Sequence, residues 1–326
     1  MFQRNNKTNQ KKTERGIALI VVLLIISVVV AATLELNASS RSEIYEAANF
    51  RDQIRALYLA KSGFYCAQGV LSENTSTYDT LGGKWAKADL ISAQSAALFD
   101  DGCFTVSVED ESGKIPVHKL VVNGKDYNTE IRDVLINFLS QPEFRLQTGQ
   151  AAAIVDAIKD WIDTDSELTG GEKGQKEPPF SKNAPLDSIE ELLMVKGISR
   201  DLFYGKDGVP GIAQYLTIFG DGRININTAP KLVLKSLSRE ITDDVANRMD
   251  SYRRSDRNEL SGPDWYRKIT GLSGLNIPSS LTTTRSRVFR ITSVGLQNGL
   301  SKTVTGVVER GEKPTDYKIV FWKVSE

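Results

Sequence analysis

The chain has 326 residues, with 41 basic and 41 acidic side chains, and 40% of its residues are apolar. This balanced charge gives no overall field that would favour nucleic acid or an anionic membrane, so partner choice has to depend on local features. A chain of this length has room for roughly two folded units with ordinary hydrophobic cores. The only histidine is His118, which excludes most enzymes that need a catalytic histidine or several histidine ligands.

An apolar run extends from Ile17 to Ala32 with Ser27 as its only polar residue, and residues 33–36 lengthen it. Its length of about 20 residues suits a bilayer-spanning helix, whereas a signal-peptide core has roughly 7–15 residues, so we expect the run to be retained. Basic side chains dominate residues 1–16, and such a flank stays on the cytoplasmic side of a membrane. No proline precedes Pro116, which predicts one long helix, first in lipid and then amphipathic. A cleaved secretory signal and an unprocessed anchor are the alternatives.

The sequence "RG" followed by "IALIVVLLI" resembles the type IV pilin and type II secretion pseudopilin families. The resemblance implies that a prepilin peptidase cuts between Gly16 and Ile17. This cut would remove the leader 1–16, expose a methylated N terminus and leave residues 17–36 as the transmembrane part of the helix. Most members carry Glu at the fifth mature position, where this chain has Val21. In this respect the chain resembles the K-type minor pseudopilins, GspK, which are placed at the filament tip.

Alternating strand patterns occur on both sides of a helical region. The segment "CFTVSVEDESGKIPV", residues 103–117, predicts two strands around a Glu-Ser-Gly turn. Three further alternating runs, in "RVFRITSVGLQNGLSKTVTGVVERG" and "DYKIVFWKV", predict antiparallel strands that complete the same sheet. With the resemblance, these patterns imply an α+β pseudopilin fold. We expect residues 37–119 and 282–326 to form its body and residues 120–281 to form a large inserted helical domain of the SAM or helix-hairpin-helix kind.

An acidic stretch follows one predicted helix of the insertion. Asp156, Asp160 and Asp163 share a helical face, where like charges repel unless a cation or water relieves them. The spacing is not that of an EF-hand, so a solvated acidic turn is the alternative to a metal site. The segment "DWID" resembles one in the GspK helical domain, which uses bound calcium. The resemblance therefore implies a Ca²⁺ site, for which the candidate ligands are Asp160, Asp163, Asp165, Glu167 and Glu172.

Two stretches, "IEELLMVKGISRDLF" and "ININTAPKLVLKSLSREITDDVANRMDSYRR", resemble helix-hairpin-helix units. In DNA-binding hairpins a glycine-containing turn lets backbone amides meet phosphates. The first unit has Gly197, but the second has no glycine in its turn "LSREITDD", and acidic residues crowd both. We expect scaffold copies of the motif and argue against nucleic acid as a partner. Tyr252, Arg253 and Arg254 are the best argument for the opposite view.

The two cysteines, Cys66 and Cys103, form no CxxC motif. If the body lies outside the cytoplasm they could pair as one disulfide, and two buried free thiols are the alternative. His118 is expected in a turn or at the surface, and no catalytic residue is assigned.

The resemblance to GspK implies a structural function and no enzymatic one. A minor pseudopilin of this type initiates and caps the pseudopilus that drives proteins across the outer membrane. The implied partners are the I- and J-type minor pseudopilins, the major pseudopilin, the prepilin peptidase and the inner-membrane assembly platform. The implied location is the inner membrane, crossed once, with the C-terminal body in the periplasm. A membrane-anchored DNA-binding protein of a DNA-uptake system and a minor pilin of a type IV pilus are the alternative functions.

Overall fold

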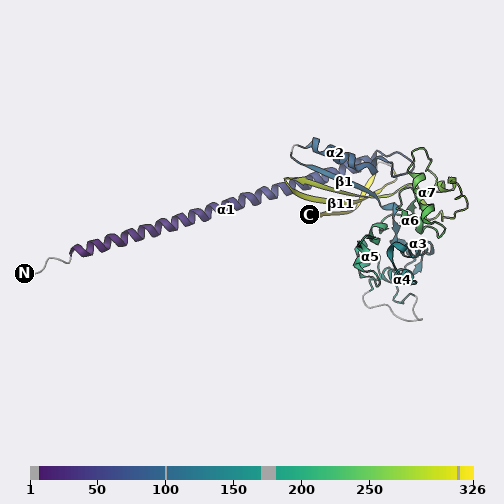
Figure 1. The fold of residues 1–326 in the computed structure, drawn as a ribbon, viewed down its shortest axis with the longest axis horizontal. Helices are drawn as coiled ribbons and strands as arrows, with labels where there is room; N and C mark the ends of the chain where they lie inside the picture. The colour runs from purple at the N-terminus through teal and green to yellow at the C-terminus, as the bar shows by residue number, and fades with distance from the viewer. Residues whose placement is uncertain (1–6, 100, 170–180, 314–315) are drawn as a thin grey trace, which may run out of the picture.

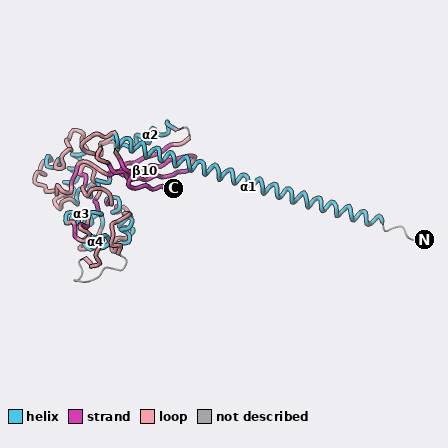
Figure 2. The backbone as a smooth tube through the Cα atoms, turned by 180° about the vertical axis from the view of Figure 1, so that it is seen from behind, coloured by secondary structure: helices cyan, strands magenta, loops and turns pink. Residues whose placement is uncertain are grey.

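The fold is a long helix that ends in a two-part body (Figure 1). The structure is a computed structural model that describes residues 7–99, 101–169, 181–313 and 316–326. One part of the body is a sheet that lies along the last turns of the helix, and the other is a helical domain beyond one end of that sheet (Figures 1 and 2). The expected α+β fold with a long N-terminal helix is confirmed.

Helix α1 runs without interruption from Lys7 to Ser72. Its first two-thirds touch little else, whereas its last turns bury one stripe of small and apolar side chains against the sheet. The buried members of this stripe recur every three or four residues, as expected for one face of a helix, and include Ala56, Ala60, Phe64, Ala67 and Leu71.

The sheet has four antiparallel strands in the order β1-β10-β11-β12. Their bounds are Cys103–Asp110 for β1, Val288–Gln297 for β10, Leu300–Arg310 for β11 and Tyr317–Ser325 for β12. Asn298 and Gly299 join β10 to β11 with φ values of 49° and 80°, the left-handed pair typical of a two-residue hairpin turn. The three predicted C-terminal strands therefore complete a sheet with the strand before Pro116, as expected.

Two glycines let α1 approach the sheet closely. A side-chain carbon on Gly295 would meet the carbonyl oxygen of Ala56 and lie 2.5 Å from the amide nitrogen of Ala60. A side-chain carbon on Gly306 would lie 2.5 Å from the Phe64 ring. Both distances are shorter than van der Waals contact, so only glycine fits at these crossing points. Phe64 fills the space over Gly306 and is fully buried.

The expected hairpin within residues 103–117 is not formed. After β1 the chain enters a 3-10 turn, Glu111–Gly113, in which the Asp110 carboxylate accepts a hydrogen bond from the Ser112 amide. The next strand, β2 (Ile115–Pro116), then pairs in parallel with β7 (Leu216–Thr217) of the helical domain and not with β1. Alternation identified the strands correctly, but it carries no information about which strand is the partner.

The helical domain is built from short elements around its own core. Its helices are α3 (Thr129–Leu139), α4 (Gln150–Ile162), α5 (Arg200–Tyr204), α6 (Lys231–Ser236) and α7 (Asp243–Arg253), while α2 (Ala88–Leu98) belongs to the sheet part. Its strand pairs, besides β2 with β7, are β3 (Val121–Val122) with β4 (Asp126–Tyr127), β5 (Gly205–Lys206) with β6 (Val209–Pro210), and β8 (Ile224–Asn225) with β9 (Thr282–Thr283).

Two separate hydrophobic cores correspond to the two parts of the body. One core joins α1 to the sheet and includes Phe64, Trp85 and Phe289. The other extends from Ile115 to Leu281. Its buried members at Ile115 and Val117 lie just before the insertion boundary of 120 that the sequence suggested, since the chain leaves the sheet core directly after the Glu111–Gly113 turn.

Candidate assembly and binding sites

The N-terminal part of α1 exposes a long apolar surface. Residues 16–47 are all exposed, including the run from Ile17 to Leu36, and the helix from Gly16 has a window of mean hydropathy 3.2. A surface of this kind is not stable in water and needs lipid or neighbouring helices. The helix thus meets the length and composition requirements of the predicted membrane anchor.

The predicted processing residues lie within this helix. Gly16 and Ile17 are both exposed, and nothing lies within 4 Å of the position where Gly16 would carry a side chain. Val21 is 49% exposed, so the helix surface carries an apolar side chain at the position of the expected missing glutamate. The cut between Gly16 and Ile17 stays a prediction.

A buried polar network joins the sheet to the helical domain. Arg310, the last residue of β11, donates from Nη1 to Oδ2 of Asp79 at 2.8 Å and from Nη2 to Oδ1 at 3.1 Å. Asp79 also accepts a hydrogen bond from the Ser286 amide, directly ahead of β10. Burial acts against the charge of Arg310, but the hydrogen bonds and charge of Asp79 outweigh it, so the pKa of Arg310 is raised. This pair fixes the loop after α1 to the strand ends.

Asp110 extends the network into the helical domain. Its Oδ2 accepts a hydrogen bond at 2.5 Å from the Thr228 hydroxyl of the "NINTA" segment, and another from the hydroxyl of Ser286. Burial raises the pKa of Asp110 to about 6, with the hydroxyl groups acting in the opposite direction. Asn225 completes the connection by donating to the Ser286 hydroxyl at 2.7 Å. The "NINTA" residues are therefore internal connectors.

Glu111 forms a second buried network beside the first. Its Oε1 accepts from Lys114 at 2.8 Å and from Arg290 at 2.7 Å, and its Oε2 accepts from the Thr217 hydroxyl at 2.6 Å. Burial favours the protonated acid, but the two cations outweigh it and hold the pKa of Glu111 below its usual value. Adjacent residues at the end of β1 thus connect to two different parts of the helical domain.

His118 lies in a short 3-10 turn and is half-buried, which agrees with its expected place in a turn or at the surface. Its Nε2 lies 3.1 Å from the carbonyl oxygen of Gly220, and its Nδ1 lies 3.4 Å from that of Thr217. Burial lowers the pKa of His118. Both ring nitrogens therefore face backbone acceptors, which is a structural arrangement.

The acidic stretch contains one fully buried carboxylate. Asp163 ends α4, and its Oδ2 lies 2.5 Å from Nζ of Lys159, while its Oδ1 is buried without a hydrogen-bond partner in the described part of the chain. Burial raises the pKa of Asp163, and the negative charges of Asp165 and Asp160 raise it further. Lys159 acts in the opposite direction but does not outweigh these effects. Burial also raises the pKa of Asp160, whose Oδ1 accepts from the Thr169 amide at 3.0 Å.

The remaining candidate ligands are less closely grouped. Asp165 is half-buried and accepts a hydrogen bond from the Glu167 amide at 2.9 Å, while the Glu167 side chain is exposed. Glu172 lies outside the described residues. Among the described residues no three acidic, histidine or cysteine side chains come close enough to hold a metal. An unpartnered buried oxygen among repelling carboxylates fits a hard cation, so Asp163 and Asp160 are the part of the predicted set that the geometry favours.

The two cysteines are not joined to each other. Both are free thiols, with Cys66 exposed on α1 and Cys103 half-buried at the start of β1. Neither the pairing nor two buried thiols, the alternatives that the sequence left open, describes this arrangement.

The three residues that favoured DNA binding all contact other residues of the protein. Arg253 is buried, donates to Oδ1 of Asp250 at 2.7 Å and donates to the carbonyl oxygen of Ile226. Arg254 pairs with the same Asp250 at 2.9 Å. The ring of Tyr252 stacks on Trp265, with 5.5 Å between centroids and 4° between planes. Arg253 and Tyr252 therefore stabilise α7 and its neighbours, whereas the Arg254 side chain is 59% exposed and pairs with Asp250 at the surface.

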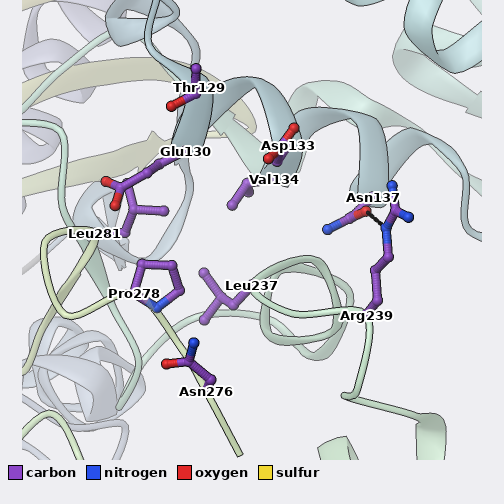
Figure 3. A pocket seen from close by; sticks show the side chains of 10 residues that line it. All are labelled: Thr129, Glu130, Asp133, Val134, Asn137, Leu237, Arg239, Asn276, Pro278 and Leu281. Atoms are coloured by element: carbon purple, nitrogen blue, oxygen red, sulfur yellow. Dashed lines mark hydrogen bonds between the residues drawn. The ribbon is translucent and has the colours of Figure 1, made fainter.

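A hollow of about 310 Å³ lies between α3 and the segment before β9 (Figure 3). Its polar lining includes Glu130, Asp133, Asn137 and Arg239, and Arg239 donates to Oδ1 of Asn137 at 3.1 Å. Ser280 donates to Glu130 beside it. These are mutual contacts of surface side chains, and they do not align a nucleophile with a base.

Comparison with known proteins shows which proteins the chain resembles. The sequence profile of "Type II secretion system (T2SS), protein K" matches residues 113–204. Type II secretion system protein K of Aeromonas hydrophila is 27% identical over 237 residues, which cover 67% of this chain and 68% of that protein. The protein of the same name from Pseudomonas aeruginosa is 26% identical over 245 residues, which cover 70% of this chain and 69% of that protein. These matches confirm the expected resemblance to protein K of type II secretion systems.

The fold of the chain also has a solved counterpart. A chain in the crystal structure of the GspK-GspI-GspJ complex from enterotoxigenic Escherichia coli superposes with a TM-score of 0.59. The match covers 88% of this chain and 99% of the other at 16% sequence identity, so it supports the fold. The expected class of minor pseudopilin is confirmed, and neither the DNA-uptake alternative nor the type IV pilus alternative is favoured.

Proposed function

We propose that the chain is the tip subunit of a type II secretion pseudopilus, where it initiates and caps the filament together with the I- and J-type minor pseudopilins. The observation that carries the proposal is the combination of an exposed apolar helix with a body that widens at the far end of that helix (Figure 1). The helix supplies the anchor and the assembly stalk, whereas the helical domain takes more room than the interior of a helical filament offers. A terminal position satisfies both.

The partners and the location follow from the same proposal. The relative of known structure is named as part of a complex with GspI and GspJ, which supports those two subunits as partners. The major pseudopilin, the prepilin peptidase and the inner-membrane assembly platform complete the set that processing and assembly need. The basic leader places the N terminus in the cytoplasm, and the body then lies in the periplasm.

The decisive experiment measures the intact mass and N-terminal sequence of the protein recovered from membranes of cells that contain a prepilin peptidase. A methylated start at Ile17 is expected. Gly16→Val is the matched control, because nothing lies near the Gly16 side-chain position in the folded helix, and it should retain the start at Met1. A wild-type start at Met1 or near Ser40 would contradict the assembly proposal, and detection of the protein along the whole filament would contradict the tip position.

We also propose that the end of α4 takes a calcium ion as a structural cofactor. The supporting observation is the unpartnered buried oxygen of Asp163 beside Asp160. When bound, calcium would neutralise the repulsion between these carboxylates and stabilise the turn after α4. Lys159 does not fully offset these effects, since burial and, to a lesser extent, the charges of Asp165 and Asp160 still raise the pKa of Asp163.

A further inference from the structure

The two edge strands of the sheet, β1 and β12, differ in how their outer backbone groups are hydrogen-bonded. On β1, the Ser95 hydroxyl accepts from the Phe104 amide at 3.1 Å and donates to the Phe104 carbonyl oxygen at 2.8 Å. The Ser92 hydroxyl bonds Val106 in the same way, at 2.8 Å and 3.3 Å. These serines, three residues apart on α2, thus replace a neighbouring strand at the outer side of β1. This edge is closed.

The opposite edge, β12, is open. Within the described part of the chain no strand, helix or side chain bonds to the backbone on its outer side. The strand has nine residues, and an edge strand of that length ordinarily invites pairing with another chain. Three of its apolar side chains are exposed, with Val320 at 39%, Trp322 at 36% and Val324 at 44%.

Trp322 is a suitable anchor at this edge. Its ring packs edge-on against the buried Phe64 of α1, with 4.8 Å between the centroids. The core therefore holds one side of the indole in place while the rest stays accessible. Because the ring is already ordered, burying it under a partner would cost little conformational entropy. On the opposite face of β12, Phe321 and Lys323 line a hollow of about 690 Å³ between the sheet and the helical domain. That hollow leaves room for side chains of an added strand.

The charges of β12 select the kind of partner. Its only charged side chains are Lys318 and Lys323, both are exposed, and neither forms an ion pair with a described residue. Two copies of β12 would bring like charges together, which disfavours self-pairing. We propose that β12 is a strand-addition site for an extended segment of another polypeptide that carries acidic side chains. That this segment belongs to a neighbouring minor pseudopilin rests on the function proposed above.

Hydrogen exchange tests this site directly. The full chain in detergent would be compared alone and after co-purification with full-length I- and J-type minor pseudopilins. We expect the β12 amides that do not bond to β11 to exchange at least tenfold more slowly in the complex. The amides of Phe104 and Val106 are the internal control, since their exchange is already limited by Ser95 and Ser92. A complex that forms without protection of the outward-facing β12 amides, or protection of those same amides in the free chain, would overturn the strand-addition site alone. Absence of any complex would overturn both proposals.

Charge reversal tests the acidic character of the partner. The double variant Lys318→Glu and Lys323→Glu should weaken retention of the partners about tenfold, whereas Lys125→Glu, an exposed lysine of the helical domain, should leave it unchanged. Thermal unfolding of each variant shows whether the body is still folded. If the double variant is folded and retains its partners as well as the parent chain, the proposed acidic segment is wrong.

Discussion

Asp79 and Arg310 form a buried ion pair between the loop after α1 and the end of β11, with 2.8 Å between Oδ2 and Nη1. The side chain of Asp79 is 0% exposed and that of Arg310 is 3% exposed. Such a pair is sensitive to the loss of one member, because the remaining charge stays buried without compensation. The attachment of the loop after α1 to the end of β11 therefore depends on both residues.

We expect Arg310→Ala to lower the free energy of unfolding by about 3–5 kcal/mol, the usual cost of leaving a buried charge unpaired. Urea unfolding of the chain in detergent measures this loss. Arg287→Ala is the matched control, since Arg287 forms only an exposed pair with Glu309 at 3.8 Å and should change the free energy of unfolding by less than about 1 kcal/mol. Equal effects of the two substitutions would contradict the role of the buried pair.

Asp110 should make stability depend on pH in a defined direction. Its pKa is raised by burial from 3.8 to about 6, so between these values the folded chain holds a proton that the unfolded chain has lost. The contribution of this group to the free energy of unfolding is therefore greatest below about pH 4 and decreases as the pH rises to about 6, by roughly 3 kcal/mol in all.

Asp110→Asn removes this titration while keeping a side chain of the same shape. The measured quantity is the free energy of unfolding of the variant minus that of the parent chain. This difference should be about 3 kcal/mol more favourable to the variant at pH 7 than at pH 4. Denaturant unfolding of both chains at the two pH values measures this difference. The contributions of the other titrating groups cancel because both chains contain them. Asp126→Asn, at an exposed position, is the control and should show no such change. A difference that does not vary with pH would contradict the raised pKa.

Strand alternation predicted the strands of the sheet, and it also places two charged residues at core-facing positions. Phe104 and Val106 alternate toward the core, and Asp110 has the same parity as these residues. Arg310 likewise shares the parity of Val304 on β11. Charged residues at core-facing positions predict buried pairing, but sequence alone does not show that Asp110 reaches hydroxyl groups and that Arg310 reaches an aspartate in a distant loop.

Local patterns failed where the partner was remote. The hairpin around Ser112 was wrong because β1 pairs with β10, with Cys103 opposite Leu296. The motif of Tyr252 to Arg254 resembled a DNA-binding element, yet burial of Arg253 assigns it to the core. Both outcomes depend on tertiary contacts that neither hydrophobic period nor charge pattern encodes. In contrast, the apolar helix needed only composition and length, which is why its prediction could be made from sequence.

The crossing of α1 over the sheet should tolerate no side chain at Gly295. Gly295→Ala would press a methyl group against the backbone of Ala56 and Ala60, which cannot move without lifting the helix. We expect a loss of about 3 kcal/mol in the free energy of unfolding, the upper range for overpacking. Gly69→Ala, at an open position of the same helix, should instead gain about 0.5–1 kcal/mol. A neutral Gly295→Ala variant would show that the helix approach is adjustable.

Calcium should raise the thermal stability of the chain through the end of α4. At a calcium concentration about 100 times the Kd, the gain in unfolding free energy is about 2.7 kcal/mol relative to a chelator. Asp163→Asn should abolish this gain, because it removes the buried charge that the ion would neutralise. Asp126→Asn should retain it. An unchanged melting temperature of the parent chain on addition of calcium would rule out the proposed cofactor.

Assembly should depend on small residues of the apolar helix. Helix packing in lipid gains little from hydrophobicity and requires close approach, so Ala31 and Ala32, with Ala18 and Ser27, are the candidate contact points. Ala31→Leu with Ala32→Leu should weaken co-purification with partner pseudopilins roughly tenfold, equivalent to about 1–2 kcal/mol of packing.

The matched control for this variant is Val29→Leu with Val30→Leu. It adds volume at two neighbouring positions of the same helix that already carry branched side chains. Both variants should insert into membranes, and urea unfolding of the body should be unchanged, since residues 16–47 are exposed and make no contact with either core. A complex that survives in detergent with leucine at both alanine positions would place the packing surface on another face of the helix. Equal losses in both variants would show that assembly responds to helix volume in general, because the smallest side chains would then have no special part in the contact.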